Sequence, residues 1–67
     1  MNASERMVLF AIGETPGANF AHVSITTRYA TAGLQRTLND LVRRNFIVQN
    51  DGRYSLQPGV KKALRSL

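Results

Sequence analysis

The clearest pattern of apolar and polar positions in this chain lies between residues 31 and 45. The apolar residues there recur at i, i+4, i+7 and i+8, and they are Leu34, Leu38, Leu41 and Val42. At this spacing they form one stripe along a helix, which indicates a helix with one buried side. The opposite side holds small, basic and amide-bearing residues, which are Ala32, Arg36, Asn39 and Arg43, with Gln35 at its margin. The pattern therefore predicts an amphipathic helix that exposes polar groups on a rigid rod.

A β-hairpin is predicted directly after this helix, over residues 46–56. Polar and apolar residues alternate in RYSL, as they do in half-buried strands, and in FIVQ the strand geometry directs Phe46 and Val48 to one side and Ile47 and Gln49 to the other. Asn50, Asp51 and Gly52 lie between the two runs, and Gly52 can adopt the positive φ of a three-residue loop. The residues expected to face the core are Phe46, Val48, Tyr54 and Leu56, with Ile47 competing for burial.

A first helix is predicted near the start of the chain. Ser4 is expected to cap it, Glu5 suits its positively polarised first turn, and the helix continues to about Ile12. Gly13 is expected to end it in a left-handed conformation. The residues expected to face the core are Val8, Leu9 and Ile12, with Met7 or Phe10 covering the flank.

A second helix is predicted to begin after Asn19, as its cap, and to end near Arg28, before a turn at Tyr29-Ala30. The β-branched and polar run 24–27 weakens this prediction, because such residues lose side-chain freedom in a helix or compete for its backbone groups. A short extended segment around residues 23–25 is the alternative.

The third helix is predicted to be capped by Thr31 and to contain Gly33 in its first turn. A glycine there costs about 1 kcal/mol relative to alanine. We expect it to allow a close approach of either the second helix or a phosphate, and helix packing is the favoured reason. Arg43 and Arg44 complement the negative end of this helix. After Pro58-Gly59, a last helix is predicted over residues 60–67.

The length and composition predict one domain, spanning residues 1–67, near the lower limit for a fold that depends on its core alone. The absence of cysteine excludes disulfides and cysteine-based metal sites and suits a reducing compartment. No apolar stretch reaches membrane-spanning length, and the start MNASER lacks the layout of a secretion signal. We therefore expect a soluble, cytoplasmic protein.

Positive charge is concentrated after the first fourteen residues. Nine Lys and Arg oppose four Asp and Glu in the whole chain, which gives a net charge of +5. From Thr15 onward only Asp40 and Asp51 oppose eight basic residues. A small domain this basic favours a polyanionic partner, and a solvated surface with a chance excess of charge is the alternative.

The run YATAGLQRTLNDLVRRNFIVQNDGRYSL resembles the winged helix-turn-helix family. Its LVRRNFIV segment is similar to the family's L-x-x-x-G-[LF]-[IV] junction, with Asn45 where glycine is most frequent. Thr27 departs from the pattern, because the family commonly has an apolar residue there. The resemblance covers residue 3 to about residue 60. It implies an α+β, mainly α fold with three helices, a two-stranded β-hairpin wing and a short C-terminal helix.

The run GLQRTLNDLVRRNFI, followed by RYSLQPGVKKAL, is also similar to the C-terminal winged-helix module of some archaeal and bacterial ATPases. The chain has no GxxxxGK[ST] phosphate-binding loop. If this kinship holds, the chain is the accessory module of a larger protein. The more familiar relatives are small transcription regulators.

The resemblance implies double-stranded DNA binding, with the third helix in the major groove and the wing on the backbone or in the minor groove. The residues expected at the bases are Thr31, Ala32, Gln35, Arg36 and Asn39. The residues expected at phosphates are Arg28, Arg43, Arg53 and Lys61. The side-chain chemistry agrees, because arginine pairs with guanine, and Gln35 and Asn39 can each pair with adenine. Asp40 would repel phosphate and limit how deeply the helix sits.

Two other functions are alternatives to DNA binding. A winged helix that binds proteins without reading DNA predicts an apolar patch around Phe10, Phe20 or Ile47, with scattered basic residues. A single DNA-binding monomer would bind weakly, so a homodimer or a larger host protein is expected. An enzyme is disfavoured, because His22 has no cysteine or second histidine to form a metal site or a triad. We expect no cofactor and no small-molecule substrate.

Overall fold

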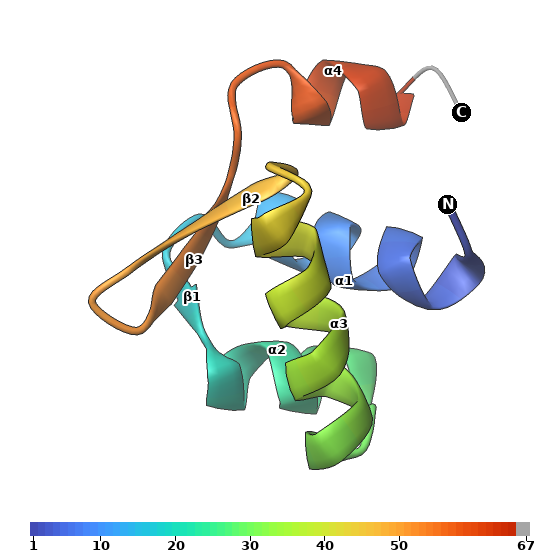
Figure 1. The fold of residues 1–67 in the computed structure, drawn as a ribbon, viewed down its shortest axis with the longest axis vertical. Helices are drawn as coiled ribbons and strands as arrows, with labels where there is room; N and C mark the ends of the chain where they lie inside the picture. The colour runs from blue at the N-terminus through green and yellow to red at the C-terminus, as the bar shows by residue number, and fades with distance from the viewer. Residues whose placement is uncertain (66–67) are drawn as a thin grey trace.

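The computed structural model describes residues 1–65, except the side chain of residue 65, and contains four helices and a small antiparallel sheet (Figure 1). The elements are α1 (Ala3–Glu14), β1 (Ala18–Asn19), α2 (Phe20–Thr27), α3 (Thr31–Arg43), β2 (Ile47–Asn50), β3 (Arg53–Leu56) and α4 (Val60–Arg65). The strand order is β1-β3-β2. This mainly helical α+β arrangement is compatible with the fold expected from the sequence. The end of the predicted last helix, residues 66–67, lies outside the described residues.

The core lies where α1, α2 and α3 meet the sheet. Its buried hydrophobic residues are Val8, Leu9, Ile12, Ala18, Val23, Leu34, Leu38, Leu41, Ile47 and Tyr54. The leucine stripe predicted for α3 is therefore confirmed, with Val42 half-buried at its edge. Over residues 1–65, none of the helices combines the length and apolar composition needed to cross a membrane.

Helix α1 begins earlier and ends later than the sequence predicted. Asn2, rather than Ser4, is the cap: its side-chain oxygen accepts from the Glu5 N–H at 2.8 Å, and the Glu5 carboxylate accepts from the Asn2 N–H at 3.0 Å. This reciprocal capping box satisfies two backbone donors at the start of the helix. Gly13 lies inside α1, so the predicted left-handed end there is wrong. A Cβ at Gly13 would lie 3.1 Å from Cδ1 of Leu56, and glycine thus lets β3 approach α1 closely.

The helical prediction for α2 is confirmed, and the extended alternative around residues 23–25 is wrong. The Asn19 side chain caps the helix by accepting from the His22 N–H at 2.9 Å. Arg28 ends the helix in the left-handed conformation, with φ 61°. Thr27 is buried, and its hydroxyl donates to the Val23 carbonyl at 2.8 Å. The buried hydroxyl therefore has a hydrogen-bond partner at a position where the family commonly has an apolar residue.

The short strand β1 was not predicted. Ala18 pairs with Tyr54, and Asn19 pairs with Arg53, which adds a third strand to the expected two-stranded hairpin. Two residues are too few to show the alternation of apolar and polar positions that indicates a strand.

Helix α3 begins without a side-chain cap. Ala30 occupies the cap position in an extended conformation, and Thr31 is the first helical residue, so the prediction that Thr31 caps the helix is wrong. The helix ends at Arg43, two residues before the predicted end. Asn45 then adopts the left-handed conformation expected of it, with φ 63°.

The hairpin has a tighter turn than predicted. Asn50 pairs with Arg53, so the turn contains only Asp51 and Gly52, with φ of 55° and 75°. Two consecutive residues of positive φ match the twist of the strands that they join. The three-residue loop predicted from the sequence is therefore wrong.

The hairpin register also decides which strand residues are buried. Ile47 pairs with Leu56, and Val48 pairs with Ser55. Because cross-strand partners share one face of a sheet, Ile47 faces the core and is buried, while Val48 faces outward and is 40% exposed. The expectation of a buried Val48 is wrong, and Tyr54 is buried as expected.

Two glycine substitutions are expected to have opposite effects on stability. A Cβ at the exposed helical residue Gly33 would meet no atom within 4 Å, so the expected close approach of α2 is wrong. Gly33→Ala should therefore raise the free energy of unfolding by about 1 kcal/mol. Gly52→Ala should lower it by about 1 kcal/mol, because Gly52 has a φ of +75°. Urea denaturation of both variants measures these changes. A lower free energy of unfolding for Gly33→Ala would contradict the open space found around Gly33.

Candidate nucleic-acid interface

The first half of α3 brings together the residues predicted to contact bases. All of them are exposed, and they are Thr31, Ala32, Gln35, Arg36 and Asn39. The spacing of three or four residues places Ala32, Gln35, Arg36 and Asn39 on one side of the helix, opposite the leucine stripe. Thr31 precedes Leu38 by seven residues and therefore lies on the side of the stripe, at the exposed start of the helix. The Gln35 side-chain amide donates to the Asn39 side-chain oxygen at 2.9 Å. This side of α3 therefore presents a guanidinium, two aligned amides and a small methyl group.

The turn between α2 and α3 holds this face in position. The Tyr29 N–H donates to the Thr27 hydroxyl at 3.4 Å, and the Ser24 hydroxyl donates to the Tyr29 carbonyl at 3.4 Å. Arg28 is exposed at the left-handed end of α2, three residues before α3 begins. Arg28 is therefore the predicted phosphate contact that lies nearest in sequence to the start of α3.

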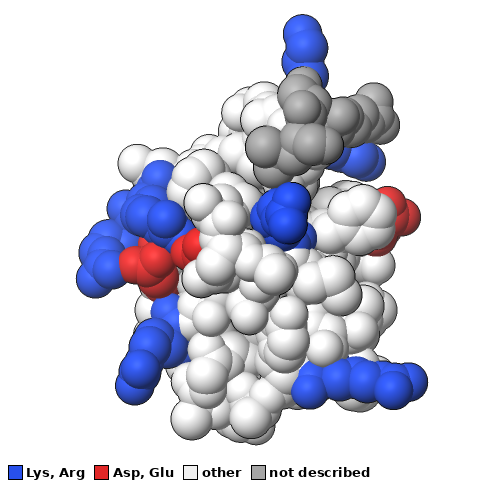
Figure 2. Space-filling view, turned by 90° about the vertical axis from the view of Figure 1, so that its right-hand side faces the viewer, with Lys and Arg blue, Asp and Glu red and all other residues white. Residues whose placement is uncertain are grey.

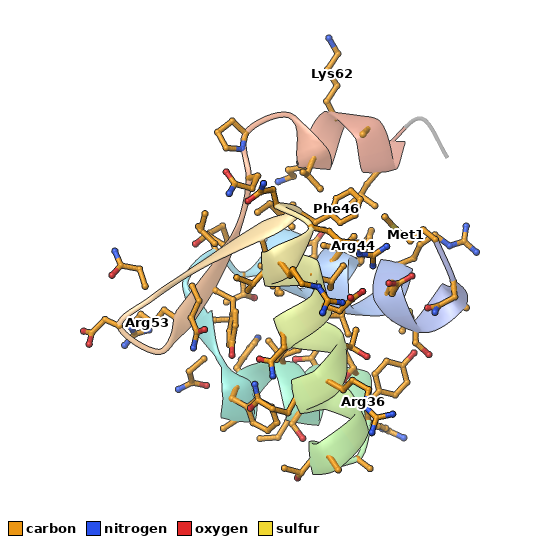
Figure 3. All side chains as sticks on the ribbon, viewed as in Figure 1. Met1, Arg36, Arg44, Phe46, Arg53 and Lys62 are labelled. Carbon is orange, nitrogen blue, oxygen red and sulfur yellow. The ribbon has the colours of Figure 1, made fainter. Side chains whose placement is uncertain are left out.

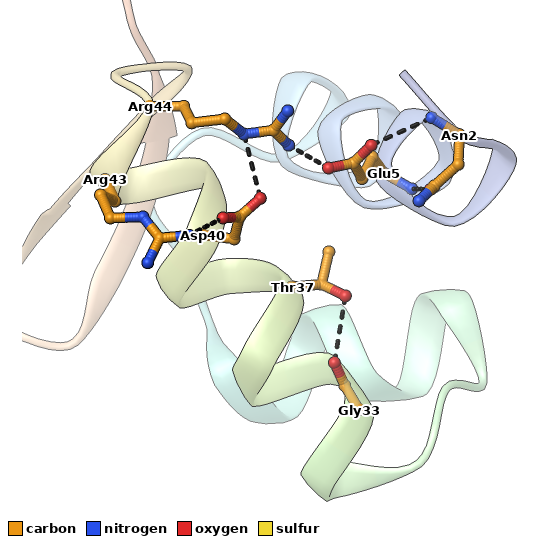
Figure 4. A network of polar contacts seen from close by, with 7 residues as sticks. All are labelled: Asn2, Glu5, Gly33, Thr37, Asp40, Arg43 and Arg44. Atoms are coloured by element: carbon orange, nitrogen blue, oxygen red, sulfur yellow. Dashed lines mark hydrogen bonds and ion pairs between the residues drawn. The ribbon is translucent and has the colours of Figure 1, made fainter.

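The second half of α3 ends in a network of ion pairs (Figure 4). Arg43 pairs with Asp40. Arg44 pairs with Glu5 of α1 and donates through Nε to Oδ2 of Asp40 at 3.0 Å. Its guanidinium carbon also lies 5.2 Å from the centre of the Phe46 ring. Arg44 therefore links the end of α3 to α1 and to Phe46, while Arg43 pairs within α3. The charges of both arginines are opposed by two carboxylates.

A shallow hollow joins this network to the exposed face of α3. It is lined by Asn2 and Glu5 from the start of α1, and by Ala32, Gln35, Arg36, Thr37, Asn39, Asp40 and Arg43 from α3. The Thr37 hydroxyl donates to the Gly33 carbonyl at 3.0 Å, which directs it along the helix (Figure 4). The hollow is thus basic at Arg36 and acidic at Asp40 and Glu5. A polyanion would meet the first half of α3 more favourably than the second.

The other predicted phosphate contacts do not lie beside this face. Arg53 donates to the Gly17 carbonyl at 3.1 Å, and in Figure 3 it lies at the hairpin, on the other side of α3 from Arg36. Lys61 belongs to α4, which lies at the opposite end of the molecule from α2 and the start of α3 (Figure 1). Figure 2 likewise shows Lys and Arg side chains at several separate places on one face. The predicted phosphate set therefore does not form one surface.

An apolar surface was underestimated from the sequence. Phe10 is 62% exposed and Met7 is 51% exposed on α1, although the sequence placed one of them at the flank of the core. Phe20 is half-buried and Ile47 is buried. Of the apolar patches predicted for a protein-binding function, only the one around Phe10 is thus present among residues 1–65. The helical spacing could have indicated it, because Phe10 lies opposite the core residues of α1.

Comparisons with protein-family models, with curated proteins and with solved structures found no match to this chain.

The capping carboxylate of α1 is expected to make stability depend on pH. The backbone N–H of Asn2 lowers the pKa of Glu5 most strongly, burial opposes this effect, and the guanidinium of Arg44 lowers the pKa further. Because the folded state favours the charged form, this stabilisation is present above the ordinary value of 4.5 and is lost as the pH falls through the lower folded-state pKa.

Glu5→Gln should therefore lower the midpoint of thermal unfolding at about pH 7 and leave it nearly unchanged in acid below the folded-state pKa, where the native carboxyl is also neutral. Glu14→Gln is the matched control, because Glu14 is an exposed carboxylate on the same helix. It should not lower the midpoint at either pH. An equal loss for Glu5→Gln at both pH values would contradict this role of its charge.

Proposed function

We propose that this chain is a double-stranded DNA-binding winged-helix module, in which the first half of α3 enters the major groove. The observation that carries the proposal is the single exposed face formed by Ala32, Gln35, Arg36 and Asn39. An α-helix fits the major groove, where arginine can donate two hydrogen bonds to guanine, and glutamine or asparagine can pair with adenine. The burial of Leu34 and Leu38 on the other side of α3 supports a fixed orientation of these groups.

Fewer residues are expected to contact phosphates than the sequence predicted. Arg28 flanks the start of α3, and Arg53 lies on the hairpin that serves as the wing in this proposal. The hydrogen bond from Arg53 to the Gly17 carbonyl and the pairing of β1 with β3 support a fixed position of the hairpin. Arg43 and Arg44 are assigned to the ion-pair network, and Lys61 to a part of the molecule away from the DNA.

A titration with duplex DNA across salt concentrations tests this function. Each phosphate neutralised by a cationic side chain makes the logarithm of the binding constant fall with the logarithm of the salt concentration, by about 0.9 per contact. Phosphate contacts from Arg28 and Arg53 therefore predict a slope of roughly −1.8. Fluorescence anisotropy of a labelled duplex gives this slope directly. Absence of binding at low salt, or a slope near zero, would reject the proposal.

A protein-binding function is the second candidate, and the exposed Phe10 and Met7 favour it. Their helix, α1, presents them away from the core, whereas DNA would contact α3. The two surfaces are therefore compatible with one molecule, either as a small transcription regulator or as an accessory module of a larger protein.

A further inference from the structure

Helix α1 carries an exposed row of residues that the core does not use. We call Ala3, Met7 and Phe10 the α1 stripe; they are exposed and follow one another at spacings of four and three residues. At about 100° per residue, Phe10 lies roughly 160° around the helix from the buried Ile12. The α1 stripe therefore points away from the elements that bury the other side of this helix.

The last helix extends this apolar surface. Ala3, Arg6, Met7 and Phe10 line a hollow together with Leu64 of α4. Leu64 is half-buried, so it forms one wall of the hollow and leaves the α1 stripe accessible. Large apolar side chains grouped in this way usually mark a surface that another molecule covers.

Two charged residues lie at equal distances on either side of Phe10. Arg6 precedes it by four residues and Glu14 follows it by four, and both are exposed. Among residues 1–65, neither side chain forms an ion pair with another described residue. Both charges also oppose the helix dipole, which favours acidic groups near the start of a helix and basic groups near its end. The charges therefore do not serve the stability of α1 itself.

We propose that the α1 stripe binds the α1 stripe of a second copy of this chain, with the two helices antiparallel and crossing at Phe10. This symmetry places Arg6 of one copy level with Glu14 of the other, and it repeats the same pair on the other side of the crossing. Phe10 then packs against its symmetry equivalent. A two-fold interface is self-complementary by construction, and the Arg6 and Glu14 positions meet that requirement.

The small size of the surface favours a weak dimer. A helix of 12 residues is about 18 Å long. An interface of this length, widened by α4, buries roughly 1,000 Å² in total, which is at the low end for specific complexes. We therefore expect a dimer that dissociates at micromolar concentrations. Because α1 meets α2, α3 and β3 through its core side, the dimer leaves the exposed face of α3 free, and it does not depend on the proposed DNA binding.

Charge reversal tests this pairing by sedimentation velocity in the absence of DNA. The native chain should form dimers as its concentration rises. Arg6→Glu places two acidic groups together, and Glu14→Arg places two basic groups together, so each variant alone should dimerise at least about tenfold more weakly. An equimolar mixture of the two variants should dimerise as the native chain does, because every Arg then faces a Glu. The double variant carrying both changes should also recover dimerisation.

The reversals are suited to this test because each one places its charge as the helix dipole prefers. Thermal unfolding followed by circular dichroism should confirm that both variants stay folded. Recovery in the mixture supports the antiparallel pairing through Phe10. A native chain that stays monomeric up to about 1 mM, single variants that dimerise as the native chain does, or a mixture without recovery would each overturn it.

Discussion

Leu38→Ala is expected to lower the free energy of unfolding by about 3 kcal/mol or more. Leu38 is fully buried in the middle of the leucine stripe, between α3 and the rest of the core. The substitution removes buried carbon atoms and leaves a cavity that a small, closely packed core cannot refill. Domains of this length have roughly 3–10 kcal/mol of stability, so the substitution should remove about a third of it or more. Urea denaturation followed by circular dichroism measures the change.

Ile25→Ala is the matched control for this prediction. It removes the same number of carbon atoms from a helix, but Ile25 is 77% exposed on α2. The free energy of unfolding should change by no more than about 0.5 kcal/mol. Equal losses at Leu38 and Ile25 would contradict the burial of the leucine stripe.

Arg36→Ala is expected to reduce the affinity for a preferred DNA duplex by at least about tenfold and to relax the base preference. A bidentate contact between arginine and guanine contributes about 1–3 kcal/mol of discrimination between bases. Arg36 is exposed at the polar side of α3, beside the aligned Gln35 and Asn39 amides. Binding to a randomised duplex pool, followed by sequencing and by anisotropy on the selected duplex, measures both effects.

Lys62→Ala is the matched control for Arg36→Ala, because it also removes one positive charge. Lys62 lies on α4, at the end of the molecule away from Arg36 (Figure 3). Charges separated from the DNA by more than about 10 Å are largely screened near physiological salt, so the affinity should change by less than about twofold. A greater loss for Lys62→Ala than for Arg36→Ala would place the DNA on another face.

The parts of the fold that depend on local sequence were predictable. The spacing of Leu34, Leu38 and Leu41 determined the buried side of α3, and the Asn19 side chain determined the start of α2. The positive φ of Asn45 was also expected from its residue type. In each case, the deciding interaction lies within a few residues of the chain.

The burial within the hairpin required information from two separated strands. FIVQ begins with three consecutive apolar residues, so either face of this strand could be the buried one. The pairing of Ile47 with Leu56 decided that Val48 faces outward. Strand β1 was missed for the same reason, since Ala18 and Asn19 are strand residues only through their pairing with β3.

The grouping of the residues proposed to contact bases was easier to predict than the placement of the residues proposed to contact phosphates. Gln35, Arg36 and Asn39 lie together because they are three or four residues apart on one helix, and this does not depend on the other elements. The roles of the arginines depended on partners far away in sequence. Arg44 meets Glu5 across 39 residues, and Arg53 meets Gly17 across 36. Composition shows the excess of positive charge but not which charges are already opposed.

The most direct test of the account is to map the DNA contact on the folded protein by NMR. Backbone amide signals of the labelled chain would be followed while a short duplex is added at low salt. We predict the largest shifts at Ala32, Gln35, Arg36 and Asn39, with smaller shifts at Arg28 and near the turn of the hairpin. Shifts confined to α1 and α4, with α3 unchanged, would contradict the claim that the outward face of α3 binds DNA.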